Sequence, residues 1–211
     1  MSNRNAMNRV NLFAVIPAAG QSRRMGKPKL LLPLGDETVI AGVIRTFQQP
    51  EISEVVVVVR AEDVALQEEL SKTAATVVIP DVDPPQMRDS IEIALRWIER
   101  TYHPAATNGW ILCPADHPLL HREVLAELIA AWKKCSTAIQ VPAFEGRRGH
   151  PVFFRWSLVD ELFSLADDAG VNALVKRYPE AVTTVEVSDA DILLDLDTPE
   201  DYAKLCQRAG I

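Results

Sequence analysis

Four cationic side chains crowd one short loop near the start of the chain, PAAGQSRRMGKPK (17–29). They are Arg23, Arg24, Lys27 and Lys29. The loop opens with a turn of small residues, Ala18-Ala19-Gly20, which lets a ligand approach the backbone closely. Guanidinium and ammonium groups beside such a turn can neutralise the charge of a triphosphate. The residue types therefore predict a binding loop for an anionic nucleotide.

This loop matches neither of two well-known phosphate loops. The Walker A pattern GxxxxGK[ST] requires four residues between its glycines, whereas five separate Gly20 from Gly26. Pro28 stands where that pattern needs a magnesium-binding hydroxyl. The Rossmann pattern GxGxxG fails because Ser22 takes the place of its second glycine. We therefore expect a different kind of nucleotide site.

The elements that must position this loop alternate between β-rich and helical patterns. The β-branched run EVVVVVR (54–60) is typical of a strand buried on both faces of a parallel sheet. We expect strands at 12–16, 54–60, 75–80, 109–114, 138–144, 150–154, 183–187 and 192–196, and helices at 37–49, 62–72, 87–102, 122–135, 156–165, 170–177 and 198–209. The alternation predicts an α/β fold with α/β/α layers and a Rossmann-like, mostly parallel sheet. One domain should span 12–211, after a disordered arm at 1–11.

Composition narrows the function classes. The chain has 211 residues and a formal net charge of −7, which disfavours nucleic-acid binding. No apolar run approaches the roughly 18 residues of a membrane span, and the polar start of the chain is no signal peptide. Its three cysteines lie far apart, without zinc or disulfide spacing. We expect a reduced, cytoplasmic protein that binds no nucleic acid and no membrane.

Ligands of open α/β sheets bind beyond the carboxyl ends of the strands. The loops at that edge should be 17–29, PDVDPPQMRDS (80–90) and PADHPLL (114–120), because they follow the first, third and fourth predicted strands. The nucleotide site is expected where these loops meet.

Five stretches of the sequence, in order, resemble motifs of the MobA-like nucleotidyltransferases. They are PAAGQSRRMGKPKLLLPLG (17–35), MRDSIEIAL (87–95), PADHPLL (114–120), GRRGHPVFF (146–154) and DLDTPEDY (195–202). They look most like the molybdenum cofactor cytidylyltransferase branch. The resemblance implies the nucleotide-diphospho-sugar transferase type of fold. It also implies that a substrate phosphate attacks the α-phosphate of an NTP and that pyrophosphate leaves, with Mg²⁺ as cofactor.

The resemblance also assigns nucleotide-binding and catalytic residues. Arg24 and Lys29 match the family's RMGxxK positions, so we expect them to hold the β- and γ-phosphates and to act in catalysis. Three small residues should bring backbone N–H groups to the nucleotide, namely Ala18, Ala19 and Gly20. Ser90 matches a serine that borders the nucleotide. The family glycine before Met87 is replaced by Gln86, which changes the shape expected for the base pocket.

Two aspartates match the family's metal carboxylates. Asp116 should bind Mg²⁺ and act in catalysis, and Asp197 should be the second metal ligand. Asp197 is not needed to start the last helix, because Thr198 can cap it and Pro199 suits its first position. Asp195, two residues earlier on an extended segment, is a reserve ligand.

The acceptor side is less well matched. Gly149 and His150 fall in the family's GHP segment and are expected to contact the acceptor. The family often has GDxGAR where this chain has ADDAGVNAL (166–174), so Asn172 replaces an arginine. This departure weakens an assignment of molybdopterin as the acceptor.

Three hypotheses follow. The first is a cytidylyltransferase for a molybdopterin-like phosphate, with CTP favoured because Ala18-Ala19-Gly20 resembles the cytidylyl branch. The second keeps the chemistry but changes the acceptor to a sugar, isoprenoid or other phosphate. The third is a nucleotide-binding module without catalysis. A molybdoenzyme or its chaperone is an open choice of partner, and the chain is expected to be a monomer or weak dimer.

Overall fold

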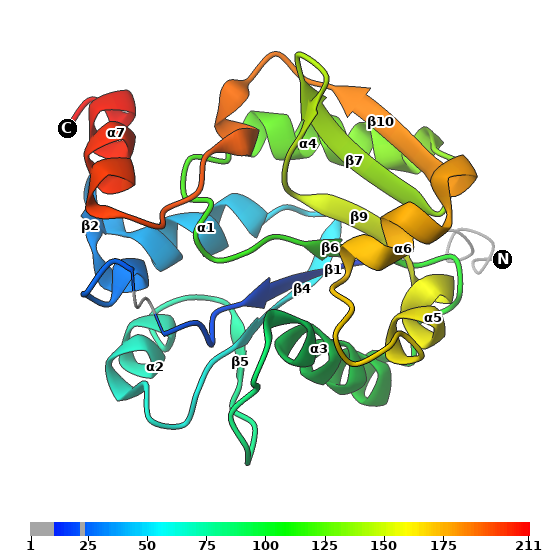
Figure 1. Cartoon of the computed structure of the whole chain (residues 1–211), viewed down its shortest axis with the longest axis horizontal. Helices are drawn as coiled ribbons and strands as arrows, with labels where there is room; N and C mark the ends of the chain where they lie inside the picture. Colours follow the sequence, from blue (N-terminus) through cyan, green and yellow to red (C-terminus); the bar gives the residue numbers. More distant parts are fainter. Residues whose placement is uncertain (1–10, 22–23) are drawn as a thin grey trace, which may run out of the picture.

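The computed structural model describes residues 11–21 and 24–211. Its main sheet has the strand order β10-β7-β9-β6-β1-β4-β5, and β8 pairs with β7 (Figure 1). The strands are β1 Leu12–Pro17, β4 Ile52–Val58, β5 Thr76–Val78, β6 Gly109–Leu112, β7 Ile139–Phe144, β8 Arg147–Arg148, β9 Val152–Arg155 and β10 Val182–Glu186. Residues 1–10 of the predicted arm lie outside the described residues.

The centre of this sheet is parallel, as predicted. β1 pairs in parallel with β4 on one side and with β6 on the other, and β10 runs parallel to β7. Only β8 and β9 of this sheet run antiparallel to their neighbours. Strand β1 is buried throughout, because both of its faces are covered by helices. The carboxyl ends of β1, β4, β5 and β6 therefore meet at one edge.

Helices cover both faces of the sheet. They are α1 Val39–Phe47, α2 Val64–Leu70, α3 Met87–Tyr102, α4 Arg122–Lys134, α5 Val159–Phe163, α6 Asn172–Arg177 and α7 Pro199–Ala209. Alternate residues of β1 divide between two cores: Ala14 and Ile16 pack with α1, α2, α4 and α7, whereas Val15 packs with α3, α5 and α6. Figure 1 shows α1 and α3 on opposite sides of β1. The predicted three layers are thus confirmed.

Two helix starts follow from local capping chemistry. Thr198 caps α7 through a capping box: its hydroxyl accepts from the Asp201 N–H, and the Asp201 carboxylate accepts from the Thr198 N–H. Pro199 takes the first helical position, as predicted. Helix α1 begins only at Val39, because Thr38 is its N-cap and accepts from the Ala41 N–H.

The structure corrects two predicted elements. The expected strand at 192–196 is a 3₁₀ turn, η4 Ala190–Leu193, followed by irregular chain. Its backbone bonds other segments instead of a sheet ladder: Ile192 accepts from His150, and Leu196 donates to Asp116. The small hairpin of β2 Pro33–Leu34 and β3 Glu37–Thr38 was not predicted, and β3 takes up the expected start of the first helix.

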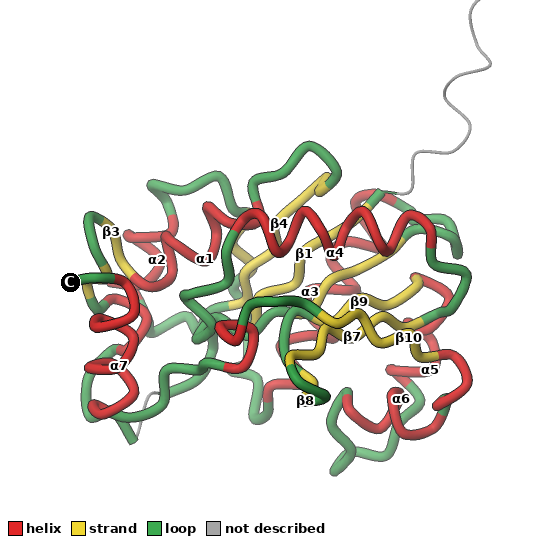
Figure 2. Tube along the Cα trace, turned by 90° about the horizontal axis from the view of Figure 1, so that it is seen from above, coloured by secondary structure: helices red, strands yellow, loops and turns green. Residues whose placement is uncertain are grey.

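Helix α7 returns to the region of this hairpin. The Tyr202 hydroxyl donates to the Pro33 carbonyl at 2.5 Å. Figures 1 and 2 both place α7 and the hairpin at one end of the molecule, with α5, α6 and β10 at the other. None of the described helices is long and apolar enough to cross a membrane.

Candidate active site

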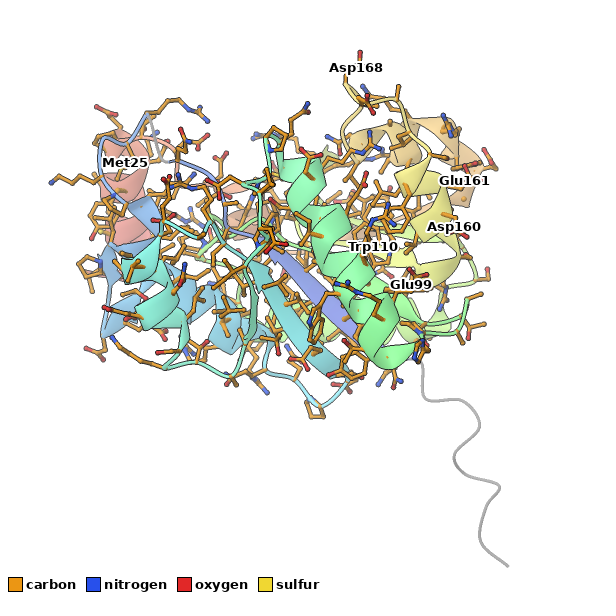
Figure 3. All side chains as sticks on the ribbon, turned by 90° about the horizontal axis from the view of Figure 1, so that it is seen from below. Met25, Glu99, Trp110, Asp160, Glu161 and Asp168 are labelled. Carbon is orange, nitrogen blue, oxygen red and sulfur yellow. The ribbon has the colours of Figure 1, made fainter. Side chains whose placement is uncertain are left out.

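A cleft of about 570 Å³ opens at the carboxyl edge of the sheet. The loops after β1, β5 and β6 meet there, as the sequence predicts. The lining includes the predicted residues Ala18, Ala19, Gly20, Arg24, Lys29, Ser90, Asp116 and Asp197. In Figure 3 the loops that carry Met25 and Asp168 project from this same edge, and the N-terminal end of α3 lies between them.

Two carboxylates from distant parts of the chain converge in this cleft. Asp116 follows β6, and Asp197 directly precedes the N-cap of α7. The ammonium group of Lys29 donates to both: Nζ lies 2.7 Å from Asp116 Oδ2 and 3.0 Å from Asp197 Oδ1. Arg24 reaches the second oxygen of Asp197, with Nη2 2.6 Å from Oδ2. Four of the predicted site residues therefore form one ionic cluster.

Backbone contacts hold the cluster in place. The Leu196 N–H donates to the Asp116 carbonyl at 2.9 Å, which joins the segment before α7 to the loop after β6. Lys29 begins the short 3₁₀ turn η1 Lys29–Leu31, and the side chain of Leu30 is buried beneath it. The stems of Lys29, Asp116 and Asp197 are thus fixed by packing, whereas the Arg24 side chain is 72% exposed.

Lys29 remains protonated in this setting. Burial by itself lowers the pKa of the ammonium group, but hydrogen bonds to Asp116 and Asp197 and the charge of these carboxylates raise it by more. The net shift is upward, so the cluster holds a permanent positive charge between two negative ones.

One backbone N–H group of the turn Ala18-Ala19-Gly20 is already hydrogen-bonded within the protein. The Ala18 N–H donates to the Val58 carbonyl at 2.9 Å, so Ala18 contributes shape rather than a free donor. Ala19 and Gly20 also line the cleft. A Cβ at Gly20 would meet no atom of the described residues within 4 Å, so their packing does not require a glycine here. The space beside Gly20 opens toward the ligand region.

The first turn of α3 forms another wall of the cleft. Gln86, Met87 and Ser90 line it, and Ser90 is buried. Gln86 is the N-cap residue, and its N–H donates to the Asp89 carboxylate at 2.8 Å. The residue that replaces the family glycine therefore shapes this wall directly.

Gly149 and His150 are outside the cleft lining of the described residues, although His150 lies close to the loop that carries Asp116. A Cβ at Gly149 would lie 2.4 Å from the Ile192 carbonyl oxygen, so this glycine permits a close backbone approach. The His150 ring packs on His117, with 4.8 Å between the ring centroids. Burial lowers the pKa of His150 to about 4 and also lowers the pKa of His117, so both rings are neutral at pH 7.

Three residues that line the cleft or lie near it were not predicted from the sequence. Arg60 lines the cleft two residues after the end of β4, and its Nη2 lies 3.0 Å from Asp63 Oδ2. Its place at the end of a buried strand was a usable signal. Asp83 also lines the cleft, within the loop after β5. Arg88 is buried and binds backbone carbonyls of the segment 162–169, which no local pattern revealed.

Asp195, the reserve ligand, is exposed and lies outside the cleft lining of the described residues. Another group with metal-ligand atoms, His121, Asp189 and Asp191, has those atoms within 4.8 Å of one another. Arg208 already pairs with Asp191, with Nη2 2.5 Å from Oδ1. Among the described residues, His121 also lies near this group, with Nε2 3.4 Å from Asp191 Oδ2.

A basic loop facing paired carboxylates at the edge of a parallel sheet offers groups that suit an anionic ligand together with a metal ion. Residues 14–182 match the MobA-like NTP transferase domain, and the chain belongs to this family of nucleotidyltransferases. The fold is that of the nucleotide-diphospho-sugar transferases, which confirms the resemblance seen in the sequence.

Curated relatives carry names that point to related chemistry. The purine catabolism protein PucB of Bacillus subtilis is 29% identical over 200 residues, which cover 90% of this chain and 94% of PucB. A molybdenum cofactor guanylyltransferase of Rhodopseudomonas palustris is 31% identical over 209 residues, which cover 90% of this chain and 89% of the relative. The molybdenum cofactor cytidylyltransferase of Escherichia coli is 24% identical over 195 residues, which cover 92% of this chain and 95% of the relative.

A solved structure shares nearly the whole fold. Rv0371c from Mycobacterium tuberculosis has a TM-score of 0.77 and 27% identity, covering 95% of this chain and 100% of Rv0371c. The same protein has also been solved in complex with manganese, with a TM-score of 0.73 over 93% of this chain and 97% of that one.

Proposed function

We propose that this nucleotidyltransferase uses Mg²⁺ to transfer CMP from CTP to a small phosphorylated acceptor, such as molybdopterin, with release of pyrophosphate. The observation that carries the proposal is the convergence of Asp116 and Asp197 on Lys29 and Arg24 within one cleft. Positioning and charge neutralisation are the main requirements of phosphoryl-type transfer, and this cluster supplies groups for both.

The carboxylates fit a divalent metal by their chemistry. Asp116 and Asp197 offer hard, anionic oxygens, which Mg²⁺ and Mn²⁺ prefer to nitrogen or sulfur ligands. Both side chains are about four-fifths buried, and both already lie around one cation, the Lys29 ammonium. When held by Asp116 and Asp197, the metal would act as a Lewis acid that stabilises the negative charge developing during the transfer.

The chain's own groups account for the remaining steps. An oxygen of the acceptor phosphate attacks the α-phosphorus of CTP, the bond from that phosphorus to the bridging oxygen of the β-phosphate breaks, and pyrophosphate leaves with the electron pair. Lys29 and Arg24 would neutralise the leaving pyrophosphate. The attacking phosphate is already an anion and needs no general base, which agrees with the neutral, buried rings of His117 and His150.

The choice of nucleotide base is less constrained by the sequence and the structure than the reaction type. Ala18-Ala19-Gly20 resembles the cytidylyl branch, which favours CTP. GTP is the second candidate, because a guanylyltransferase is among the relatives at 31% identity. Gln86 on the α3 wall could meet either base, since its amide both donates and accepts.

Pyrophosphate release tests the proposal. The protein, with Mg²⁺, is given each of the four NTPs in turn, together with molybdopterin, its molybdenum-loaded form, a sugar phosphate and an isoprenoid phosphate. We expect release with CTP and a pterin. Release with GTP and no other NTP would show that the nucleotide substrate is GTP rather than CTP. Release with a different acceptor would show that the acceptor is not molybdopterin. CTP binding by calorimetry without release from any mixture would favour a non-catalytic nucleotide-binding module.

A further inference from the structure

One histidine and two aspartates from separate segments converge outside the cleft lining of the described residues. His121 directly precedes α4, Asp189 is the N-cap of η4, and Asp191 lies within η4. His121 Nε2 lies 3.7 Å from Asp189 Oδ2 and 3.4 Å from Asp191 Oδ2. Figure 1 shows the segment between β10 and α7 passing beside the start of α4. The fold thus brings one imidazole nitrogen and two carboxylate oxygens together.

Each of the two carboxylates keeps one oxygen for a ligand. Asp189 Oδ1 accepts from the Asp191 N–H at 2.9 Å, and Asp191 Oδ1 pairs with Arg208 Nη2 at 2.5 Å. In both carboxylates the other oxygen, Oδ2, faces the nitrogen of His121. Carboxylates that bind metals are oriented in this way by a second partner. These contacts therefore hold both Oδ2 atoms in a fixed direction.

Asp191 lacks the hydrogen bonds that a buried carboxylate needs. Its side chain is only 8% exposed, and its Oδ1 accepts no aligned hydrogen bond within the described residues, although it forms the ion pair with Arg208. Burial of a charged group is costly unless other groups compensate it. Arg208 balances one of the two carboxylate charges, so a net negative charge remains when His121 is neutral. This remaining charge favours a bound cation.

The spacing of the donor atoms suits a small transition-metal ion. Zinc binds nitrogen and carboxylate oxygen at about 2.0–2.2 Å, which places neighbouring ligands of a tetrahedral site about 3.4 Å apart. The two distances from His121 Nε2, 3.4 and 3.7 Å, are close to this value. Mg²⁺ prefers oxygen ligands, whereas an imidazole nitrogen suits zinc and its neighbours in the transition series. The donor set therefore selects against Mg²⁺.

We propose that His121, Asp189 and Asp191 bind a divalent transition-metal ion such as Zn²⁺, with solvent completing the coordination. This site is separate from the carboxylates of the cleft and goes beyond the proposed function. His121 ends the loop that carries Asp116, and Asp191 opens the segment that leads to Asp197. The ion braces these two segments against each other and has a structural role.

Zinc titration of the full chain tests the proposal. Isothermal titration calorimetry is carried out in an excess of Mg²⁺, which occupies oxygen sites but competes poorly for an imidazole nitrogen. We expect the parent to bind Zn²⁺ and His121→Gln to bind it at least about tenfold more weakly, because even the loss of an outer-shell partner costs about 10–100-fold. Asp189→Asn should weaken the binding in the same way.

His103→Gln is the matched control, because it removes another exposed imidazole, at the end of α3. It should keep the parental affinity for Zn²⁺. The imidazole NMR signals of the four histidines give a second readout. Zn²⁺ should shift those of His121, which are identified by their absence in His121→Gln.

Two results would overturn the proposal. Equal Zn²⁺ affinity in the parent and His121→Gln would place the bound ion elsewhere. Absence of Zn²⁺ binding by the parent would mean that a protonated His121 balances the carboxylates without a metal. The proposed function fails separately, because pyrophosphate release is measured with Mg²⁺ and requires no zinc.

Discussion

The carbonyl oxygen of Ile192 lies where a side chain at Gly149 would begin, 2.4 Å from an ideal Cβ. Two hydrogen bonds fix this approach: the Gly149 N–H donates to Pro142 at 2.9 Å, and the His150 N–H donates to Ile192 at 3.0 Å. The β7–β8 hairpin is thereby joined to the segment that leads into Asp197. A glycine outside the cleft thus sets the course of the chain that carries a proposed metal ligand.

Gly149→Ala should disturb that segment. The added methyl group clashes with backbone rather than with a flexible side chain, so we expect a loss of about 1–3 kcal/mol in the free energy of unfolding. Displacement of Asp197 should also reduce pyrophosphate release. Urea unfolding and the enzyme assay measure the two effects. Gly170→Ala is the control, since a Cβ there would meet no atom within 4 Å in the part of the chain that the structure describes. Equal stability of the two variants would contradict the prediction.

Asp116→Asn should remove most turnover while the fold survives. The amide keeps the size of the side chain but loses the charge that a metal and Lys29 both need, and loss of one such electrostatic group costs about 10²–10³ in kcat. The rate of pyrophosphate release and the circular dichroism spectrum check the two halves of the prediction. Asp168→Asn, an exposed carboxylate outside the cleft lining, should retain parental activity. Near-parental activity in Asp116→Asn would remove Asp116 from the mechanism.

Lys29→Ala should slow the chemical step. Removal of a cation that faces the leaving phosphates raises the barrier by about 2–4 kcal/mol, the usual loss for one such donor. Single-turnover rates with saturating CTP and Mg²⁺ separate this effect from weaker binding. Lys27→Ala in the same loop should change the rate far less, and an unchanged rate for Lys29→Ala would show that Lys29 is not in the reaction site.

Arg88→Met should destabilise the wall formed by the first turn of α3. The guanidinium of Arg88 is buried and donates hydrogen bonds to the Glu92 carboxylate and to four backbone carbonyls, which belong to Leu162, Leu165, Ala166 and Ala169. Leaving these acceptors unpaired should cost about 3–5 kcal/mol in urea unfolding. Faster amide hydrogen exchange is expected across 162–169. Arg96→Met, an exposed arginine on the same helix, should cost about 1 kcal/mol or less.

Acid should destabilise the protein through His150. Burial lowers the pKa of this ring from 6.5 to about 4, so the folded protein keeps it neutral while the unfolded chain takes up a proton below about pH 6.5. The stability that it contributes is complete above pH 6.5 and is lost as the pH falls toward 4. Between pH 7.5 and 5 this loss is about 2 kcal/mol.

Urea unfolding at several pH values measures the loss. His150→Gln cannot take up that proton, so its stability should fall less steeply over the same range. Identical pH slopes for the parent and His150→Gln would show that the ring is not held neutral by the fold.

Much of the fold could be predicted because its signals are local. The β-branched run after Glu54 identified a buried strand, and Thr198 with Pro199 identified the start of α7. The small residues and cations in the loop after β1 predicted a binding site for an anionic nucleotide. The motif resemblance led to the family that the comparisons confirm. Propensity, capping and charge all act between residues close in the chain.

Other features depend on long-range contacts that the sequence does not contain. The segment at 192–196 has the apolar residues of a strand, yet its backbone bonds His150 and Asp116 and so becomes a turn. The pairing of Arg88 with carbonyls some 75 residues away follows only from helix packing.

The sequence by itself determined the strand and helix pattern, the basic loop and the residue types at the cleft. Only the tertiary structure decided that Lys29 lies between Asp116 and Asp197 and that Gly149 and His150 lie outside the cleft lining. The physical reason is that a side chain's partners depend on which segments the sheet brings to one edge, and that order is set by the packing of the whole chain.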